Sequence, residues 1–154
     1  MKLAFFVPGR PVPKQSFRLG RRGGWQPKRV TDYKKRIRWI VHGAMRRHGW
    51  KKPDPLTPLH VRLRFAFNLP VGTRKAHRNT TSLRVTIPDV DNITKAVLDG
   101  CSDLWSDDRQ VAILEVVKLN VPRGSQGVTV QVETIDDEEV RSQIIHGWTE
   151  TTGE

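Results

Sequence analysis

Residues 59–67 read Leu-His-Val-Arg-Leu-Arg-Phe-Ala-Phe, in which large apolar side chains occupy every second position. Successive side chains of a strand point to opposite faces of a sheet, so this alternation predicts a strand with one buried face. Residues 128–132 repeat the pattern, with Val128, Val130 and Val132 separated by polar residues. These two stretches predict a sheet that buries one side, and they are the basis of the fold assignment.

Two segments have apolar residues at helical spacing and are expected to pack with the sheet. The first runs from about residue 32 to 48, with Thr31 as its N-cap and Gly49 at its end. The second runs from about residue 92 to 104. Their apolar stripes comprise Tyr33, Ile37, Ile40, Val41 and Ala44 in the first helix and Ile93, Ala96, Val97, Cys101 and Leu104 in the second.

The remaining elements complete an α+β fold with a mixed, mostly antiparallel sheet of about four strands and two main helices. Residues 3–7 predict a first strand, and residues 111–121, apolar on both faces in their first half, predict a central one. Residues 9–30 and 69–87 are expected to be basic loops, the first of them long and mobile. Asp136 or Asp137 is expected to cap a short helix that ends near Gly147. Trp39, Phe65 and Phe67 are expected in the core, and Trp105 is expected to brace the turn that follows it.

Length and composition bound the class of protein. The 154 residues fit one domain, expected over residues 1–135 and followed by an acidic tail at 136–154. No apolar run reaches 18 residues, so no membrane span is expected, and the N-terminus lacks the features of a secretory signal. The single cysteine, Cys101, excludes an internal disulfide and favours a reducing cytoplasm.

The charge is divided unevenly along the chain. The total of 27 Lys and Arg against 16 Asp and Glu gives a net +11, yet residues 1–84 hold all but five of the cations and only Asp32 and Asp54 of the acids. An imbalance of this size predicts a polyanion partner for the first half, with a solubilising or membrane-surface role as the alternative. Nucleic acid is preferred because the cations lie on strands and Gly-rich loops. The residues expected to contact DNA phosphates are Lys14, Arg18, Arg21, Arg22, Lys28, Arg29, Arg74, Lys75 and Arg78.

Acidic residues gather around the second predicted helix. Asp89 and Asp91 flank Val90, so an extended backbone would point both carboxylates to one side, and Lys95 lies one helical turn after Asp91. Hard carboxylate oxygens without His or Cys partners suit Mg²⁺, for which Mn²⁺ is expected to substitute. The chain has no zinc motif, phosphate-binding loop or nucleophile elbow. The chemistry that remains is attack on a phosphodiester by metal-activated water, with no organic cofactor.

A structural interpretation competes with this one at each position. Asp91 alone is explained as an N-cap, Lys95 as a surface ion pair, and Asp107 and Asp108 as turn residues before a strand. About 13 residues of helix also separate the first two acids from the last two by about 20 Å. A sharp return at Trp105 and Ser106, or a partner subunit, would have to bring Asp108 to the other acids.

The pattern as a whole resembles the core motif of the RusA-type Holliday junction resolvases. It comprises Asp89-x-Asp91-Asn92-x-x-Lys95-Ala96, then Leu98-Asp99, then Asp107-Asp108-Arg109-Gln110-Val111, preceded by a similar N-terminal segment, Pro8-Gly9-Arg10-Pro11-Val12-Pro13-Lys14. The motif covers residues 88–111, and the order of elements agrees along residues 1–134. Two departures are the long basic segment at 9–30 and Ile113, which stands where many relatives have an acid.

This resemblance implies a homodimeric, Mg²⁺-dependent endonuclease that resolves four-way DNA junctions by paired symmetric nicks in recombination and repair. It implies a bacterial or phage-encoded protein that acts on branched DNA. By motif, Asp89, Asp91 and Asp108 are the catalytic acids that bind metal, and Lys95 is the catalytic base-like or electrostatic residue. Whether Asp107 also binds metal stays open.

Three alternatives remain at this stage. The chain could be a non-catalytic basic DNA-binding protein whose acids are caps and turn residues. It could be a metal nuclease that acts on other branched or single-stranded DNA. A basic scaffold protein is the third, and it predicts no preference for branched over linear DNA.

Overall fold

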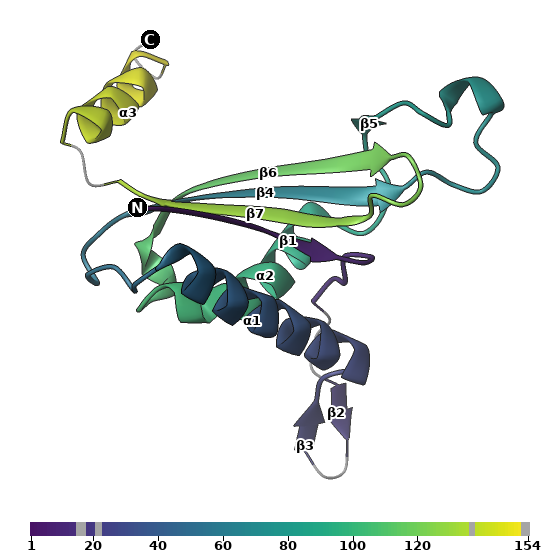
Figure 1. Ribbon diagram of the computed structural model, residues 1–154, viewed down its shortest axis with the longest axis horizontal. Helices are drawn as coiled ribbons and strands as arrows, with labels where there is room; N and C mark the ends of the chain where they lie inside the picture. The colour runs from purple at the N-terminus through teal and green to yellow at the C-terminus, as the bar shows by residue number, and fades with distance from the viewer. Residues whose placement is uncertain (15–17, 21–22, 136–137, 152–154) are drawn as a thin grey trace.

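A five-stranded sheet forms one layer of the molecule, and two helices cover one of its faces (Figure 1). The computed structural model describes residues 1–14, 18–20, 23–135 and 138–151. Three of the four strand pairs in this sheet are antiparallel, and one is parallel. The α+β class with a mixed, mostly antiparallel sheet is therefore confirmed. In spatial order the strands are β1 (Lys2–Pro8), β7 (Gly127–Thr134), β4 (Leu59–Asn68), β6 (Val111–Val121) and β5 (Ser82–Leu83).

The parallel pair, β4 and β6, determines where the second helix lies. Parallel neighbours need a crossover connection, and α2 (Val90–Cys101) provides it. Because β6 runs parallel to β4, α2 has to run back along the sheet, so its first turn lies near the end of β6 and its last turn near the start. Two short 3₁₀ turns, η2 (Ser102–Leu104) and η3 (Asp108–Gln110), join the helix to β6.

The predicted alternation builds the core. The side chains of Val61, Phe65, Val128, Val130 and Val132 are fully buried beneath α1 (Lys28–His48) and α2. The two helices pack closely at Gly100, where an added Cβ would lie 2.8 Å from atoms of Ile37. This close approach fixes α2, and with it the acidic residues at its start, against α1 and the sheet.

The first helix begins one turn earlier than the sequence predicts. Pro27 holds the N-cap position of α1, without a side-chain cap, so Thr31 is not the cap. A proline at this boundary sets the backbone for the helix and has no N–H that the helix would leave unpaired. The expected end is confirmed, because Gly49 adopts the left-handed conformation, with φ of 64°, in which glycine avoids a Cβ clash.

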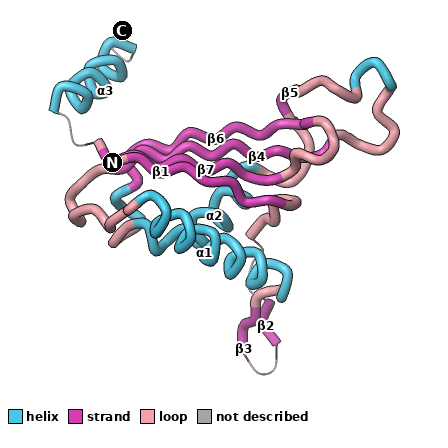
Figure 2. The backbone as a smooth tube through the Cα atoms, viewed as in Figure 1, coloured by secondary structure: helices cyan, strands magenta, loops and turns pink. Residues whose placement is uncertain are grey.

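Four further expectations need correction or extension. Trp39 is 78% exposed, because it lies outside the buried stripe of α1. The long basic segment is not wholly a loop, since residues 18–20 and 23–25 pair as the strands β2 (Arg18–Gly20) and β3 (Gly23–Trp25), which project from the start of α1 (Figure 2). A terminal helix does form, as α3 (Glu138–Thr151), and runs past Gly147.

The fourth correction concerns β6, which was expected to be central. Its outer neighbour β5 pairs only with Leu119 and Asn120, so the first half of β6 lies at an edge of the sheet. Within the described ranges, no helix is long and apolar enough to cross a membrane.

Candidate functional site

Asp89 and Asp91 line the same open cavity at the start of α2. The cavity has a volume of about 530 Å³ and lies against the second half of β6. Asp89 holds the N-cap position with an extended backbone, but its side chain makes no capping hydrogen bond. Both carboxylates are exposed. The other lining residues are Leu83, Arg84, Val85, Val90, Val116, Val117 and Lys118.

Two cations tie the segment that carries these acids to the sheet. The Nζ of Lys118 on β6 donates to the backbone carbonyls of Thr86 and Pro88, at 2.7 Å each. The guanidinium of Arg84 donates to the carbonyl of Ile87 at 2.6 and 3.1 Å. It lies 4.6 Å from the centre of the Phe67 ring. The position of the acids is therefore set by the sheet and not by an independent loop.

Lys95 lies one turn further along α2 and faces Asp91. Its Nζ is 3.4 Å from Oδ2 of Asp91, and the two side chains are 60% and 59% exposed. An exposed pair of this kind contributes well under 1 kcal/mol to stability. Both groups are accessible to a ligand at the mouth of the cavity.

Asp108 lies in a turn with many internal hydrogen bonds beyond the far end of α2. Trp105, which is 2% exposed, donates its Nε1 hydrogen to Oδ1 of Asp108 at 2.7 Å. The preceding Asp107 accepts from the backbone of Arg109 and forms a capping box with Gln110. The expectation that Trp105 braces this turn is confirmed.

The chain does not bring Asp108 to the other two acids. The 12 residues of α2 span about 18 Å, and Asp108 does not line the cavity of Asp89 and Asp91. Among the described residues, no group of three or more His, Cys, Asp or Glu side chains is close enough to hold a metal ion. A single chain therefore presents two acids at one end of α2 and a third at the other.

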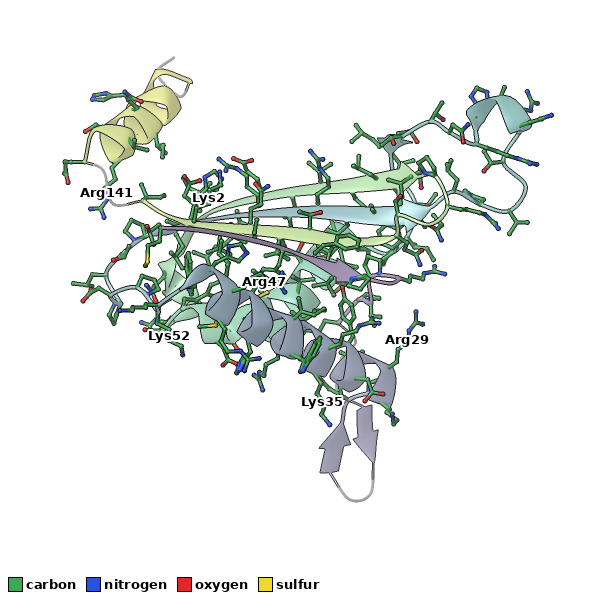
Figure 3. The ribbon with its side chains drawn as sticks, viewed as in Figure 1. Lys2, Arg29, Lys35, Arg47, Lys52 and Arg141 are labelled. Atoms are coloured by element: carbon green, nitrogen blue, oxygen red, sulfur yellow. The ribbon has the colours of Figure 1, made fainter. Side chains whose placement is uncertain are left out.

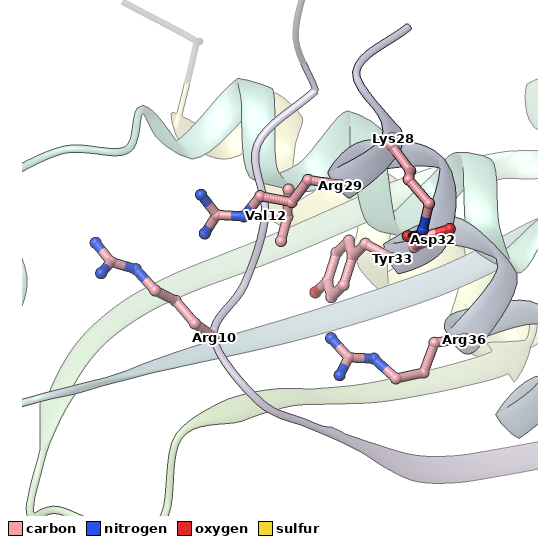
Figure 4. A pocket seen from close by; sticks show the side chains of 7 residues that line it. All are labelled: Arg10, Val12, Lys28, Arg29, Asp32, Tyr33 and Arg36. Carbon is pink, nitrogen blue, oxygen red and sulfur yellow. Dashed lines mark hydrogen bonds and ion pairs between the residues drawn. The ribbon is translucent and has the colours of Figure 1, made fainter.

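A basic cavity of about 620 Å³ lies near the start of α1 (Figure 4). Lys28 and Arg29, both expected to contact phosphates, line it, together with Arg10 and Arg36. The last two were missed by sequence reasoning, although Arg10 belongs to the motif of residues 8–14. The segment that carries Arg10 also reaches the first turn of α2, because the N–H of Lys14 donates to the carbonyl of Asn92 at 2.9 Å. The basic cavity and the first turn of α2 are thus connected by one short stretch of chain.

The sequence profile of the endodeoxyribonuclease RusA family matches residues 8–133, a range that includes both cavities and the turn of Asp108. The chain belongs to the RusA family of endodeoxyribonucleases. A search of curated proteins found no match. Helix α3 lies outside the matched range.

The acidic cavity of this RusA-family chain suits a magnesium ion in its donor chemistry. Mg²⁺ usually keeps several waters and is bound through one or two carboxylates together with substrate phosphates. Asp89 and Asp91 supply two hard carboxylates without any His or Cys among the lining residues. Asp89 makes no capping bond, and Asp91 forms only a long, exposed ion pair with Lys95 at 3.4 Å, so both carboxylates can turn toward a cation.

The remaining residues expected to contact DNA lie in three places. Arg74, Lys75 and Arg78 are exposed on and beside the 3₁₀ turn η1 (Lys75–His77), at the far end of the sheet from α3. Arg18 lies on β2, whose backbone alone is described, and Arg21 and Arg22 lie outside the described residues. Figure 3 labels Arg29 and Lys35 near the start of α1 and Lys52 beyond its end, so exposed cations occur along the whole helical layer.

Lys14, one of the residues expected to contact phosphates, forms an ion pair within the chain. Its Nζ lies 3.0 Å from Oδ2 of Asp99, and Lys34 approaches the same oxygen at 2.6 Å. Burial alone would raise the pKa of Asp99, but hydrogen bonds and charge from Lys34 and Lys14 outweigh it and hold that pKa below its ordinary value. Asp103 similarly pairs with Arg38 and His42. These two acids therefore pair with cationic residues, and they join α2 and η2 to α1.

Proposed function

We propose that this RusA-family chain is a Mg²⁺-dependent endonuclease that resolves four-way DNA junctions by paired nicks, as a homodimer, in recombination and repair. The observation that carries the proposal is the coincidence of the family match with the cavity of Asp89 and Asp91. A homodimer follows from the substrate, since symmetric cuts in a two-fold junction need two equivalent sites.

The residues of the chain have separate roles in this proposal. Asp89 and Asp91 would hold the divalent ion, which when bound would polarise a phosphoryl oxygen and lower the pKa of a water. Lys95, next to Asp91, would offset the negative charge that develops on the phosphate during attack. Asp108 would act with them as a third acid.

The basic surfaces would hold the junction arms. Lys28, Arg29, Arg10 and Arg36 around the basic cavity would contact phosphates beside the scissile one, and Arg74, Lys75 and Arg78 would contact a more distant arm. Phosphate contacts do not read the base sequence, so discrimination between DNA substrates would come from the shape of the junction. Binding should weaken steeply with salt, with a log–log slope of about −0.9 for each duplex phosphate contacted.

The test is nicking of a synthetic four-way junction in the presence of Mg²⁺ and in its absence. Asp91→Asn should reduce nicking by about 10²–10³-fold, because it weakens the hold on the ion that would stabilise transition-state charge. Asp103→Asn is the matched control, because this carboxylate follows α2 closely but faces α1, and it should nick as wild type does.

Three results would contradict the proposal, each in a different way. Full activity of Asp91→Asn would exclude the assigned site. Tight DNA binding by wild type without metal-dependent cleavage would identify a non-catalytic binding protein. Faster cutting of flaps, forks or single strands than of four-way junctions would identify a nuclease with another substrate.

A further inference from the structure

The first turn of α1 gathers positive charge where a helix tolerates it least. Free N–H groups and the helix dipole make the N-terminal end of a helix positive, so acidic residues are favourable there and cations are unfavourable. The first turn of α1 has no acidic residue and begins with Lys28 and Arg29. Both line the basic cavity together with Arg10 and Arg36. A bound anion would relieve the repulsion among these groups.

The chain does not neutralise the arginines of this cavity. The one acid among the lining residues, Asp32, forms an ion pair with Lys28. Within the described part of the chain, Arg10, Arg29 and Arg36 have no carboxylate partner, and they are called the three arginines below. The net formal charge of the lining residues is +3. The cavity is therefore electrostatically incomplete without an anion.

A buried hydroxyl without a hydrogen-bond partner faces the same cavity. Tyr33 is 2% exposed, and its Oη makes no hydrogen bond within the described structure. In Figure 4 this oxygen points into the space between the three arginines. Burial raises the pKa of the hydroxyl, and the charge of Arg36 and the nearby backbone of Val12 lower it by less, so the group keeps its proton at neutral pH. A buried donor without an acceptor is unfavourable, and a ligand oxygen in the cavity would satisfy it.

The guanidinium of Arg36 is positioned without the use of its N–H groups. Its central carbon lies 5.5 Å from the centre of the Tyr33 ring. A Cβ at Gly9 would lie 3.2 Å from one of its nitrogens, and Gly9 has a φ of 97°, so glycine both leaves room for the guanidinium and adopts this backbone without strain. In the described structure no hydrogen bond to the chain occupies the guanidinium, and its five N–H donors can serve a ligand.

The charge and the donors of the cavity suit a phosphate monoester better than a phosphodiester. A phosphodiester within a strand carries one negative charge and has two free oxygens. A monoester carries about −1.5 to −2 charges at neutral pH and has three acceptor oxygens. A phosphodiester of an uninterrupted strand can contact the exposed arginines at the rim, as in the proposed function. A monoester, esterified on one side only, can in addition place an oxygen against the buried hydroxyl of Tyr33.

We propose that the basic cavity binds the terminal phosphate of a DNA strand, with the three arginines neutralising its charge and the Tyr33 hydroxyl donating to one of its oxygens. The family of the chain acts on DNA, so the end of a strand is the source of the phosphate that we propose, in preference to free phosphate. This site goes beyond the proposed function, because it requires neither a metal ion nor cleavage.

Binding of short single-stranded oligonucleotides in EDTA tests the site without any contribution from cleavage. Three oligonucleotides of one sequence carry the same internal fluorophore and differ only at their ends, which bear two hydroxyls, a 5′-phosphate or a 3′-phosphate. Fluorescence anisotropy at constant ionic strength measures their dissociation constants. At least one phosphorylated form should bind about tenfold more tightly than the hydroxyl form, the gain expected from a hydrogen bond to a charged group.

Three variants assign this preference to the cavity. Tyr33→Phe keeps every charge and should abolish most of the preference for a terminal phosphate. Its denaturant midpoint should not fall below that of wild type, since only an unpartnered oxygen is removed. Arg36→Gln should also abolish the preference, and because Arg36 is exposed this variant decides the matter if Tyr33→Phe does not fold. Lys35→Gln is the matched control: it removes an equal charge from the adjacent exposed residue, which does not line the cavity, and should keep the preference.

Several outcomes would overturn the proposal. Equal binding of the three oligonucleotides by wild type would exclude a site for terminal phosphate, and a preference that survives in Tyr33→Phe and Arg36→Gln would place that site elsewhere. Inorganic phosphate should displace the phosphorylated oligonucleotide only weakly. If it binds as tightly as the oligonucleotide does, the cavity is a site for free phosphate and the DNA end is excluded. A failure of wild type to nick junctions in Mg²⁺ would contradict the proposed function and leave this site standing.

Discussion

The two ends of α2 present carboxylates in opposite ways. At the start of the helix, Asp89 and Asp91 are exposed; Asp89 makes no capping hydrogen bond, and Asp91 forms a 3.4 Å ion pair with Lys95. Beyond the end, Asp108 is fixed by the buried indole of Trp105, and its neighbour Asp107 is fixed by a capping box. The first pair is free to meet a ligand, whereas the Asp108 turn is pre-formed. The difference predicts that substitutions at the start affect activity and that substitutions at the far end also affect stability.

The largest expected effect is on nicking activity and concerns the exposed acids at the start of α2. Asp89→Asn should lower the rate of junction nicking by about 10²–10³-fold, because it removes one of two carboxylates in the cavity. The free energy of unfolding should change by less than about 0.5 kcal/mol, since the side chain makes no capping hydrogen bond. Nicking assays and denaturant unfolding of one preparation measure both. A large loss of stability would remove the contrast between the two ends.

Among these substitutions, Gln110→Ala should cause the largest loss of stability. Gln110 lies in the turn of Asp108, beyond the end of α2. Gln110 is 5% exposed, and its Oε1 accepts from the N–H groups of Ser106 and Asp107. Its Nε2 donates to the carbonyls of Asp54 and Thr57. Truncation removes all four hydrogen bonds of this buried side chain and should cost about 3 kcal/mol. Denaturant unfolding measures the loss, and Arg109→Ala, whose side chain is 91% exposed, is the control that should cost far less.

Trp105→Phe should have a smaller effect, on both the free energy of unfolding and the rate of junction nicking. The ring still fills the core, but the Nε1–H that holds Asp108 at 2.7 Å is lost, which should cost about 1 kcal/mol. If Asp108 has to be held in place to act, nicking should fall several-fold as well. Unchanged nicking in a folded Trp105→Phe variant would show that the orientation of Asp108 is unimportant.

The smallest effect lies between the two ends, at Asp99. The lysines that lower the pKa of Asp99 stabilise its charged form in the folded state. That contribution is present above the unfolded pKa of about 4 and is lost as the pH falls through the lower folded value. Asp99→Asn should therefore be less stable than wild type by about 1 kcal/mol at pH 7, and the gap should close toward pH 2. Thermal unfolding across this pH range checks the sign, and a gap that widens in acid would contradict it.

Sequence patterns predicted the elements of the fold well because each depends on local periodicity. The alternation in β4 and β7 placed their valines, leucines and phenylalanines correctly in the core. The expected span of β6 agrees with the structure at both ends. The motif around Asp89 and Asp91 likewise located a cavity, because both acids lie within one turn of the same helix.

The errors concern relations between distant segments. Nothing in the residues of β4 and β6 shows that these two strands run parallel, and it is this pairing that sends α2 back along the sheet and separates Asp108 from the other acids. The apolar run at residues 111–117 has the composition of a central strand, yet in the described structure β5 pairs only with Leu119 and Asn120 on the outer side of β6. Arg10 and Arg36 were missed because their common cavity is formed by segments that meet only in the folded state.

Lys118 and Arg84, which donate hydrogen bonds to the segment before α2, also determine the charge balance of the acidic cavity. Their two positive charges line the same cavity as the two carboxylates, so the cavity wall is formally neutral, and Lys95 at its mouth adds a positive charge. A cavity of two acids alone would repel a phosphodiester. In the proposed function, the negative groups that would attract a cation and the positive groups that would tolerate a phosphate lie in one wall, so neither ligand would have to arrive first.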